Sequence, residues 1–419
     1  MTVESIALVE HESLPILGKR SRGQKALATR HATLLAKLEN RLPAQTFSWR
    51  HRSVKFAHYC GVISLGDLSL EILPKIHGRE NEPGACRSAL IRMLTKARLL
   101  KTRRGGAADI ALQRHSLLDV FLLHFCDQLQ AELTQGMIRH YVERNANLHV
   151  LRGRLQVEQQ LKHNLAHRER LYCRYDELSV DNRHNQVIRH VLRAMTRLSG
   201  GIAVKKRLNE LLFRFEAVRD VPVTTETLEN LYFDRSTSRY RDIFRQCRWF
   251  LQGLHPDVVT GHASCATLLF DMNRLFEAYA ANIFRDLARA EGLRLRTQGP
   301  CKYMVWREDR DDQVFLMKPD MVFFDHKSRI VSIADAKWKL LDDREKKLGI
   351  SQADLYQMAG YAMRYGTDRL ALVYPRQQHL QHSTTFYLQG SDASITIIPL
   401  DVTVRPHLSP PISHWTGRG

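Results

Sequence analysis

The chain has 419 residues and carries 63 Lys and Arg against 44 Asp and Glu, which gives a formal net charge of +19. This length predicts two or three domains, and the positive charge favours a polyanionic partner without identifying it. No apolar run approaches the ~20 residues of a membrane span, which argues against a membrane partner. The cysteines are scattered singly, which argues against a zinc ribbon. Because no signal-like start is present either, we expect a cytoplasmic protein.

Residues 1–165 are predicted to form an N-terminal domain that begins with strands and continues with helices. Short β-prone runs come first, and segments with leucines at helical spacing follow. The strand candidates are Phe47–Trp49, Tyr59–Ser64 and Leu68–Leu73, and the helix candidates are Ala89–Leu100 and Ser116–Leu133. The basic and polar stretch Arg152–Arg170 is where we place the boundary of this domain.

Residues 166–261 are predicted to form a helical subdomain. The helical pattern runs over 182–254 and is interrupted at Gly200-Gly201 and at Val221–Val223. No part of the sequence contains the glycine-rich loop ending in Gly-Lys-Ser or Gly-Lys-Thr that cradles nucleotide phosphates, since the pair Gly18-Lys19 lacks the earlier glycine. We therefore expect that the chain does not hydrolyse nucleotide by itself, and that any nucleotide site belongs to a partner.

Two short segments in the predicted C-terminal domain, residues 262–404, carry the strongest indication of chemistry. They are Lys318–Met321 and Ala334–Lys337, in or beside the β-rich runs Val314–Phe324 and Ile330–Lys337. The polar break Asp325–Arg329 has the length of a hairpin turn, which predicts that Asp320 and Asp335 lie at the same end of a sheet. Residues two apart on a strand point the same way, so Asp335 and Lys337 share a face.

Two carboxylates and a lysine at one place indicate a Mg²⁺ site for phosphodiester cleavage. Mg²⁺ prefers oxygen ligands, which Asp320, Asp335 and the carbonyl of Ala336 can supply, and Mn²⁺ is the alternative metal. The metal polarises the scissile phosphate and lowers the pKa of its water. Lys337 would orient that water or offset charge on the phosphate. The alternative interpretation is a hairpin with a surface Asp and an exposed Asp–Lys pair.

Two predicted helices flank these strands and add further candidates. In Asp271–Gly292 apolar residues recur at helical spacing, and Glu277 lies off that stripe beside small residues, so it is a candidate third carboxylate. A solvent-exposed helix glutamate is the equal alternative. A second helix is expected over Ser351–Tyr365, where Asp354, Gln357 and Tyr361 fall on one face. They would contact the metal-bound water or a phosphate, or only tie the helix to the sheet.

The order of these elements resembles the PD-(D/E)xK nuclease superfamily over roughly residues 260–400. The matching positions are Glu277, Asp320, Asp335 and Lys337, and Gln357 with Tyr361 is similar to RecB-like nucleases. This resemblance implies a restriction-endonuclease-like core with a mixed central sheet flanked by helices, so an α/β fold class is expected for the chain. Residues 405–419 contain several Pro and Gly and are expected to form a flexible tail.

Other segments resemble the McrC family over most of the chain, from about residue 50 to about residue 400. They are Ile72–Ile76, Leu151–Leu155, Tyr175–Asn182 with Asn185-Gln186, and Asp271–Glu277. The resemblance implies the nuclease subunit of an McrBC-type restriction system that cleaves foreign or cytosine-modified double-stranded DNA. It also implies an McrB-like AAA+ GTPase hexamer as partner, which binds the GTP. The N-terminal domain would dock on this hexamer and stimulate its GTP hydrolysis.

Two other functions fit the same sequence. The first is an assembly factor and GTPase stimulator with an inactive nuclease fold, and the second is a stand-alone RecB-like structure-specific nuclease. The intact set of Asp320, Asp335 and Lys337 argues against the first, because an inactive site has no reason to keep all three. The large N-terminal region argues against the second, because a stand-alone nuclease has no evident need for it.

Overall fold

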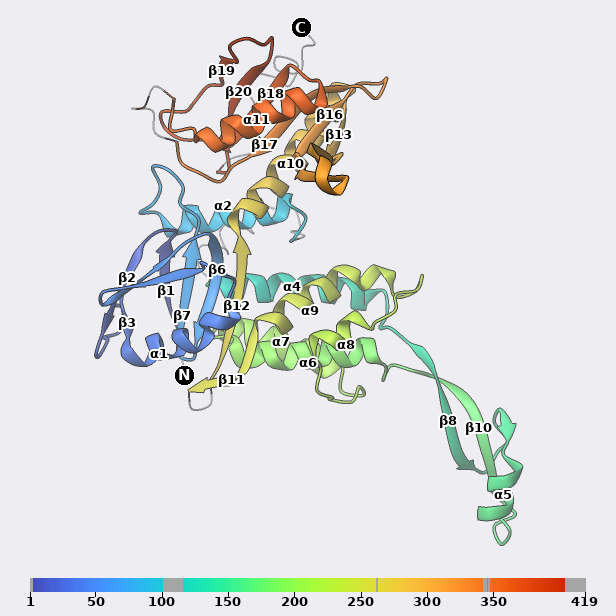
Figure 1. Cartoon of the computed structure of the whole chain (residues 1–419). Helices are drawn as coiled ribbons and strands as arrows, with labels where there is room; N and C mark the ends of the chain where they lie inside the picture. The colour runs from blue at the N-terminus through green and yellow to red at the C-terminus, as the bar shows by residue number, and fades with distance from the viewer. Residues whose placement is uncertain (1–2, 101–115, 261–262, 342–344, 346, 404–419) are drawn as a thin grey trace. The chain divides into compact units, whose positions relative to one another are not determined.

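The computed structural model describes residues 3–100, 116–260, 263–341, 345 and 347–403 (Figure 1). The chain divides into two units that are not continuous in sequence. The first, here called the helical unit, contains Met1–Glu4, Ser64–Asp67 and Leu118–Leu268, and the second, here called the sheet unit, contains Ser5–Ile63, Leu68–Leu117 and Leu269–Gly419. The linear domain boundaries given above remain predictions, and the predicted tail at 405–419 lies outside the described residues.

The helical unit is built from amphipathic helices, and helices are present where the pattern over 182–254 predicts them. Helix α6 follows the N-cap Asn182, whose side chain accepts a hydrogen bond from the Asn185 amide, and Val187 and Val191 belong to its buried stripe. The helices are α4 (Leu117–Thr134), α6 (Arg183–Leu198), α7 (Ile202–Arg214), α8 (Thr225–Glu229) and α9 (Arg241–Gly253), followed by the antiparallel strands β11 (Leu254–Thr260) and β12 (Ala263–Asp271). No helix in the described part of the chain is long and apolar enough to cross a membrane.

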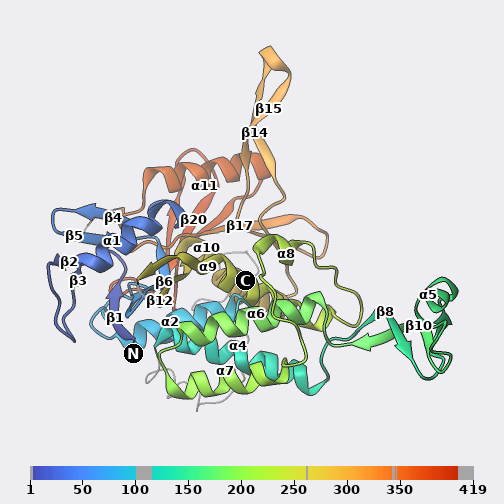
Figure 2. The ribbon, with the colours of Figure 1, turned by 90° about the horizontal axis from the view of Figure 1, so that it is seen from below.

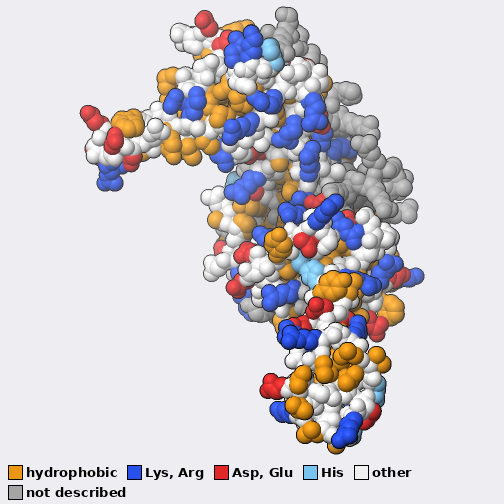
Figure 3. Space-filling view, turned by 90° about the vertical axis from the view of Figure 1, so that its right-hand side faces the viewer, with side chains coloured by type: hydrophobic (Ala, Val, Ile, Leu, Met, Phe, Trp, Pro, Cys, Tyr) orange, Lys and Arg blue, Asp and Glu red, His pale blue; other side chains and the backbone are white. Residues whose placement is uncertain are grey.

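A two-stranded arm extends from the helices of this unit (Figures 1 and 2). Strands β8 (His140–Leu148) and β10 (Leu171–Ser179) pair antiparallel, and β9 (Arg154–Leu155) and helix α5 (Val157–His163) lie at the tip. The stretch 152–170, where we predicted a domain boundary, forms this tip. Figure 3 shows hydrophobic side chains on the surface of the arm. Val150 is 73% exposed and Leu165 is 72% exposed.

The N-terminal part of the sheet unit is β-rich, as its β-prone runs predict. The predicted strands at 47–49, 59–64 and 68–73 are β4, β6 and β7, and the helix predicted at 89–100 is α2. Strands β1, β7 and β6 are neighbours in that order in one sheet, and a second sheet has the order β3-β2-β5-β4. The bounds are β1 (Glu4–Val9), β2 (Ser13–Leu17), β3 (Leu27–Ala28), α1 (Thr29–Leu38), β4 (Phe47–Arg50), β5 (Ser53–Phe56), β6 (Tyr59–Leu65), β7 (Leu68–Leu73) and α2 (Pro83–Lys96).

The C-terminal part of the sheet unit contains a mixed six-stranded sheet with the order β13-β16-β17-β18-β20-β19. Pairs β13–β16, β16–β17 and β19–β20 are antiparallel, whereas β17–β18 and β18–β20 are parallel. The elements are α10 (Met272–Ala290), β13 (Arg294–Thr297), β16 (Met321–Phe324), β17 (Ile330–Ala336), α11 (Gln352–Tyr365), β18 (Arg369–Pro375), β19 (Thr384–Tyr387) and β20 (Ser394–Leu400). The mixed α/β class is confirmed, while the assignment to the PD-(D/E)xK superfamily remains a prediction.

Helices α10 and α11 cover opposite faces of this sheet, as Figure 2 shows. Val322 and Ile333 point into the core that Met358 of α11 helps to form. The neighbouring residue Phe323 points the other way, and its ring meets that of Phe284 on α10 edge to face at a centroid distance of 6.2 Å. The alternation of a strand therefore serves both layers, because each face of the central strands is buried.

The two predicted helices are confirmed. Asp271 caps α10 by accepting hydrogen bonds from the amides of Asn273 and Arg274, and Ser351 caps α11 by accepting one from the Asp354 amide.

The predicted continuous strand over 314–324 is wrong. Residues Asp312–Met317 form β15, which pairs with β14 (Lys302–Arg307) in a separate two-stranded hairpin, and the main sheet resumes only at β16. The break falls at Lys318-Pro319-Asp320, where proline supplies no amide hydrogen for a ladder. The turn predicted at Asp325–Arg329 is present, and the Asp325 carboxylate accepts hydrogen bonds from the amides of Lys327 and Arg329.

The close approach of Gly253 to strand β12 gives a test of the helical unit. A Cβ at this position would lie 1.8 Å from the backbone oxygen of Thr267, so Gly253→Ala must push α9 away from that strand. We expect it to cost about 1–3 kcal/mol of stability and to lower the Tm. Gly84→Ala on α2, where nothing lies within 4 Å, is the matched control and should leave the Tm unchanged or slightly raised. Equal Tm values for the two variants would contradict this packing.

Candidate active site

The two predicted metal-binding aspartates meet at the end of β17. The Ala336 amide donates a hydrogen bond of 2.9 Å to Oδ2 of Asp320, and Asp335, which is 2% exposed, directly precedes Ala336. The amide and carbonyl of one strand residue point to the same side of the strand, so the carbonyl of Ala336 also faces Asp320. The hairpin thus brings together the three groups that the sequence proposes as oxygen ligands.

The predicted lysine joins these carboxylates to helix α11. The Nζ atom of Lys337 lies 2.5 Å from Oδ2 of Asp335 and donates a 3.0 Å hydrogen bond to Oε1 of Gln357. Gln357 in turn donates from Nε2 to the Tyr361 hydroxyl at 2.9 Å. The structure therefore places both predicted α11 residues in one hydrogen-bonded chain with Asp335, although only Gln357 contacts the lysine directly.

Glu277 approaches the site through a residue that the sequence reasoning missed. Gln298 donates from Nε2 to Oε1 of Glu277, and the same nitrogen lies 3.5 Å from Oδ1 of Asp320. The amide of Gln298 also donates to the Asp320 carbonyl at 3.0 Å, which fixes its backbone beside that residue. A lone glutamine after strand β13 gives no pattern in sequence, and its only signal is its place before Gly299-Pro300.

Asp354, which the helical spacing places on one face with Gln357 and Tyr361, also lies at the site. Its carboxylate lies 3.7 Å from Nζ of Lys337 and 3.0 Å from Nζ of Lys339. Burial opposes the ionised form, but the hydrogen bonds from Ser351 and Lys339 and the charges of the two lysines lower the pKa of Asp354. Asp354 therefore balances part of the lysine charge beside Asp335.

The carboxylates facing Asp320 carry more negative charge than the site neutralises. Burial, then the charges of Asp335 and Glu277, raise the pKa of Asp320 to about 8. Burial and the charge of Asp335 also raise the pKa of Glu277, against the hydrogen bond from Gln298. Burial alone would lower the pKa of Lys337, yet the adjacent Asp335 raises it. Such a site favours an added cation.

The donor set fits a hard divalent cation. The described residues contain no group of three His, Cys, Asp or Glu side chains in a metal-holding arrangement. Mg²⁺ does not need one, because it usually keeps several waters and takes only one or two protein carboxylates. Asp320, Asp335 and the carbonyl of Ala336 offer oxygen alone, which is the ligand type that Mg²⁺ and Mn²⁺ prefer. The metal itself remains a prediction.

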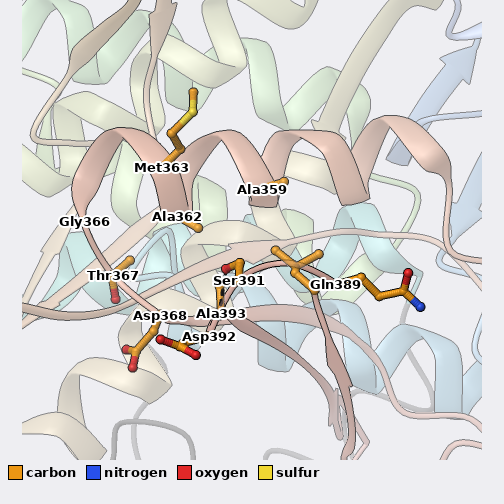
Figure 4. Close-up of a pocket in the computed structure, with 11 residues that line it drawn as sticks. Ala359, Ala362, Met363, Gly366, Thr367, Asp368, Gln389, Ser391, Asp392 and Ala393 are labelled. Carbon is orange, nitrogen blue, oxygen red and sulfur yellow. Dashed lines mark hydrogen bonds between the residues drawn. The ribbon is translucent and has the colours of Figure 1, made fainter.

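A separate hollow of about 800 Å³ lies at the C-terminal end of α11 (Figure 4). Met363, Asp368, Gln389 and Asp392 are among the residues that line it, and the two aspartates lie close together. None of the predicted site residues lines this hollow, so the candidate active site is distinct from it.

Comparison with known proteins places these features in a family. A family model described as McrBC 5-methylcytosine restriction system component matches residues 54–375. None of the curated proteins matches the chain.

Two solved structures have a similar fold. One is the refined half-complex from a tetradecameric assembly of Thermococcus gammatolerans McrB AAA+ hexamers with bound McrC, which matches with a TM-score of 0.73 and 20% identity over 99% of this chain and 98% of that chain. The other is the cryo-EM structure of the McrBC complex of the same organism, which matches with a TM-score of 0.52 and 23% identity over 67% of this chain and 87% of that chain.

The raised pKa of Asp320 predicts how the stability of the metal-free protein depends on pH. The folded pKa of about 8 exceeds the ordinary value of 3.8, so the stability linked to protonation is fully present below about pH 4 and is lost as the pH rises through about 8. The Tm in EDTA should fall between about pH 5 and about pH 9 more steeply for the wild type than for Asp320→Asn. Parallel Tm curves for the two proteins would contradict the shift.

Proposed function

Because the chain belongs to the McrBC family of 5-methylcytosine restriction system components, we propose that it is the DNA-cleaving subunit of such a system. In this proposal it is a Mg²⁺-dependent endonuclease that cuts foreign or cytosine-modified double-stranded DNA. The observation that carries the proposal is the hydrogen bond between the Ala336 amide and Asp320, which sets two carboxylates and a strand carbonyl beside Lys337. This set has the composition that phosphodiester hydrolysis requires.

The metal ligands in this proposal are Asp320, Asp335 and the carbonyl of Ala336. When bound, Mg²⁺ would polarise the scissile phosphate and acidify a water molecule. Glu277 would assist at the metal directly or through water, since Gln298 connects its carboxylate with that of Asp320. The negative charge of these carboxylates would attract a cation to the strand end. Until that cation is present, the same charge would repel phosphate.

Lys337 has two neighbours that define its role. Its ammonium group pairs with Asp335, which is a metal ligand in the proposal. With Asp335 serving as a metal ligand, the ammonium group of Lys337 would orient the attacking water or offset the developing charge on the phosphate. Gln357, itself held by Tyr361, keeps the lysine near the strand end during this change.

The partner proposal rests on the similar solved structure and on the sequence. That structure contains McrB AAA+ hexamers with bound McrC, and its matched chain aligns with almost all of this chain. The sequence holds no phosphate-binding loop, so GTP would be bound by an McrB-like hexamer and not by this chain. Docking of the N-terminal domain on that hexamer, with stimulation of its GTPase, belongs to the same proposal. The net charge of +19 supports duplex DNA as the polyanion.

Cleavage by Asp335→Asn tests the site. With Mg²⁺, GTP and the McrB-like partner, plasmid cleavage should fall by about 10³-fold or more, because the change removes a charged metal ligand while keeping its shape. Asp392→Asn, at the hollow near the end of α11, is the matched control and should cut like the wild type.

The same variant separates the alternative functions. Stimulation of the partner's GTPase should survive in Asp335→Asn. Full cutting by this variant would remove the site assignment. GTPase stimulation by a wild type that never cuts would favour the assembly factor, and cutting by the wild-type chain without partner or GTP would favour the stand-alone nuclease.

Lys337→Ala should separate metal binding from cleavage. Cleavage should fall by about 10²-fold or more, because the cation beside the phosphate is lost. The rise in Tm on adding Mg²⁺ should persist, because both carboxylates remain and Asp335 loses its competing partner. Loss of the Mg²⁺-dependent rise in Tm would show that the lysine is needed for the metal and not for the reaction.

A further inference from the structure

A buried glutamate of the N-terminal region reaches the strand that carries the proposed catalytic lysine. Glu10, which follows β1 and is 4% exposed, accepts a 2.9 Å hydrogen bond at Oε2 from the indole Nε1 of Trp338. Its other oxygen, Oε1, accepts a 3.1 Å hydrogen bond from the amide of His58. Its own amide donates to the carbonyl of Leu73 at 2.8 Å. Apart from the bond from the tryptophan, Glu10 is therefore held by one hydrogen bond to its carboxylate and one from its backbone amide.

Trp338 connects the chain segment that carries Lys337 with the helix that carries Glu277. It directly follows Lys337, and the chain turns at this point, since the Lys339 amide donates to the Lys337 carbonyl at 3.0 Å. The indole ring packs against the buried ring of Phe276 at a centroid distance of 5.3 Å, and Phe276 directly precedes Glu277. Trp338 is thus adjacent in sequence to Lys337, and its ring contacts Phe276, the residue that precedes Glu277.

The corner at His58 holds helix α10 as well. Its amide binds Glu10, and its carbonyl accepts a 3.0 Å hydrogen bond from the amide of Met272, the first residue of α10. The helix that carries Glu277 and the indole beside Lys337 therefore depend on the same short piece of chain.

We propose that Glu10 is a positioning residue of the nuclease centre, which acts through Trp338 to fix Lys337 relative to Glu277. This inference rests on the proposed function. A misplacement of about 1 Å in a catalytic group can cost about 10²-fold in rate, so a single hydrogen bond at the point where the strand turns is enough to matter. Asp320 and Asp335 lie in the hairpin and do not depend on Glu10, so metal binding should not need this contact.

Single-turnover cleavage by Glu10→Gln and Trp338→Phe tests the proposal, with the full chain, its McrB-like partner, GTP and saturating Mg²⁺. Glutamine has one acceptor oxygen where glutamate has two, and phenylalanine keeps the ring on Phe276 while removing the indole donor. Each variant should lower the cleavage rate constant by about tenfold, and the double variant should be no slower than the slower single one. The rise in Tm on adding Mg²⁺ should stay as in the wild type.

A matched control exists in the same region. Trp49 donates from Nε1 to Oε2 of Glu39 at 3.1 Å on the exposed surface, so Glu39→Gln and Trp49→Phe make the same chemical changes away from the site. Because both residues lie in the N-terminal domain that is proposed to dock on the partner, GTPase stimulation is measured in parallel, and control variants that stimulate like the wild type should also cut at the wild-type rate.

The pattern of results distinguishes a positioning role from a structural one. If Glu10 has only a structural role, its variants should lower the Tm and the fraction of active protein. The amplitude of cleavage would then fall while the rate constant stays unchanged, and that result would overturn the proposal. Wild-type rates in Glu10→Gln and Trp338→Phe would overturn it as well, as would additive losses in the double variant. If Glu10→Gln does not fold, Trp338→Phe decides. A wild type that does not cut, with or without the partner, is instead a failure of the proposed function.

Discussion

The Ala336 amide donates to a carboxylate oxygen of Asp320 at the place where β16 has not yet begun to pair with β17. Without this bond the Ala336 amide at the end of β17 would lose this hydrogen-bond acceptor, and Asp320 would lose the hydrogen bond that holds it beside Asp335. The bond also has an unfavourable electrostatic effect, because it holds a second carboxylate next to a buried one. The charge of Lys337 reduces this repulsion, and the proposed cation would reduce it further.

Much of this arrangement follows from local rules that a sequence displays. The apolar spacing after Asp271 and the cap at Ser351 predicted the two helices, and the polar turn after β16 predicted the hairpin that joins the two aspartates. These features depend on residues close in sequence, for which spacing and capping chemistry are informative. The roles of the site residues remain predictions, but their proximity is now a property of the structure.

The features that the sequence did not predict depend on contacts between distant segments. Gln298 reaches Glu277 and Asp320 because a strand end, a helix and a loop meet, and no periodicity marks such a meeting. The β-rich run over 314–324 predicts one strand because most of its residues are apolar. The chain instead leaves the β14–β15 hairpin and enters the main sheet at Pro319, which depends on tertiary contacts. The bond between Glu10 and Trp338 spans 328 residues, which no local pattern can reveal.

The division of the sheet unit between the two ends of the chain has a consequence for biosynthesis. Ser5–Ile63 leaves the ribosome long before Leu269–Gly419, and most of the helical unit, Leu118–Leu268, is made between them. Contacts such as that between Glu10 and Trp338 can form only after nearly the whole chain has been translated, and such non-local contacts form slowly. A truncated product, whether from interrupted synthesis or from proteolysis between the units, therefore lacks one part of the sheet unit, and with it either Glu10 or the residues of the candidate active site.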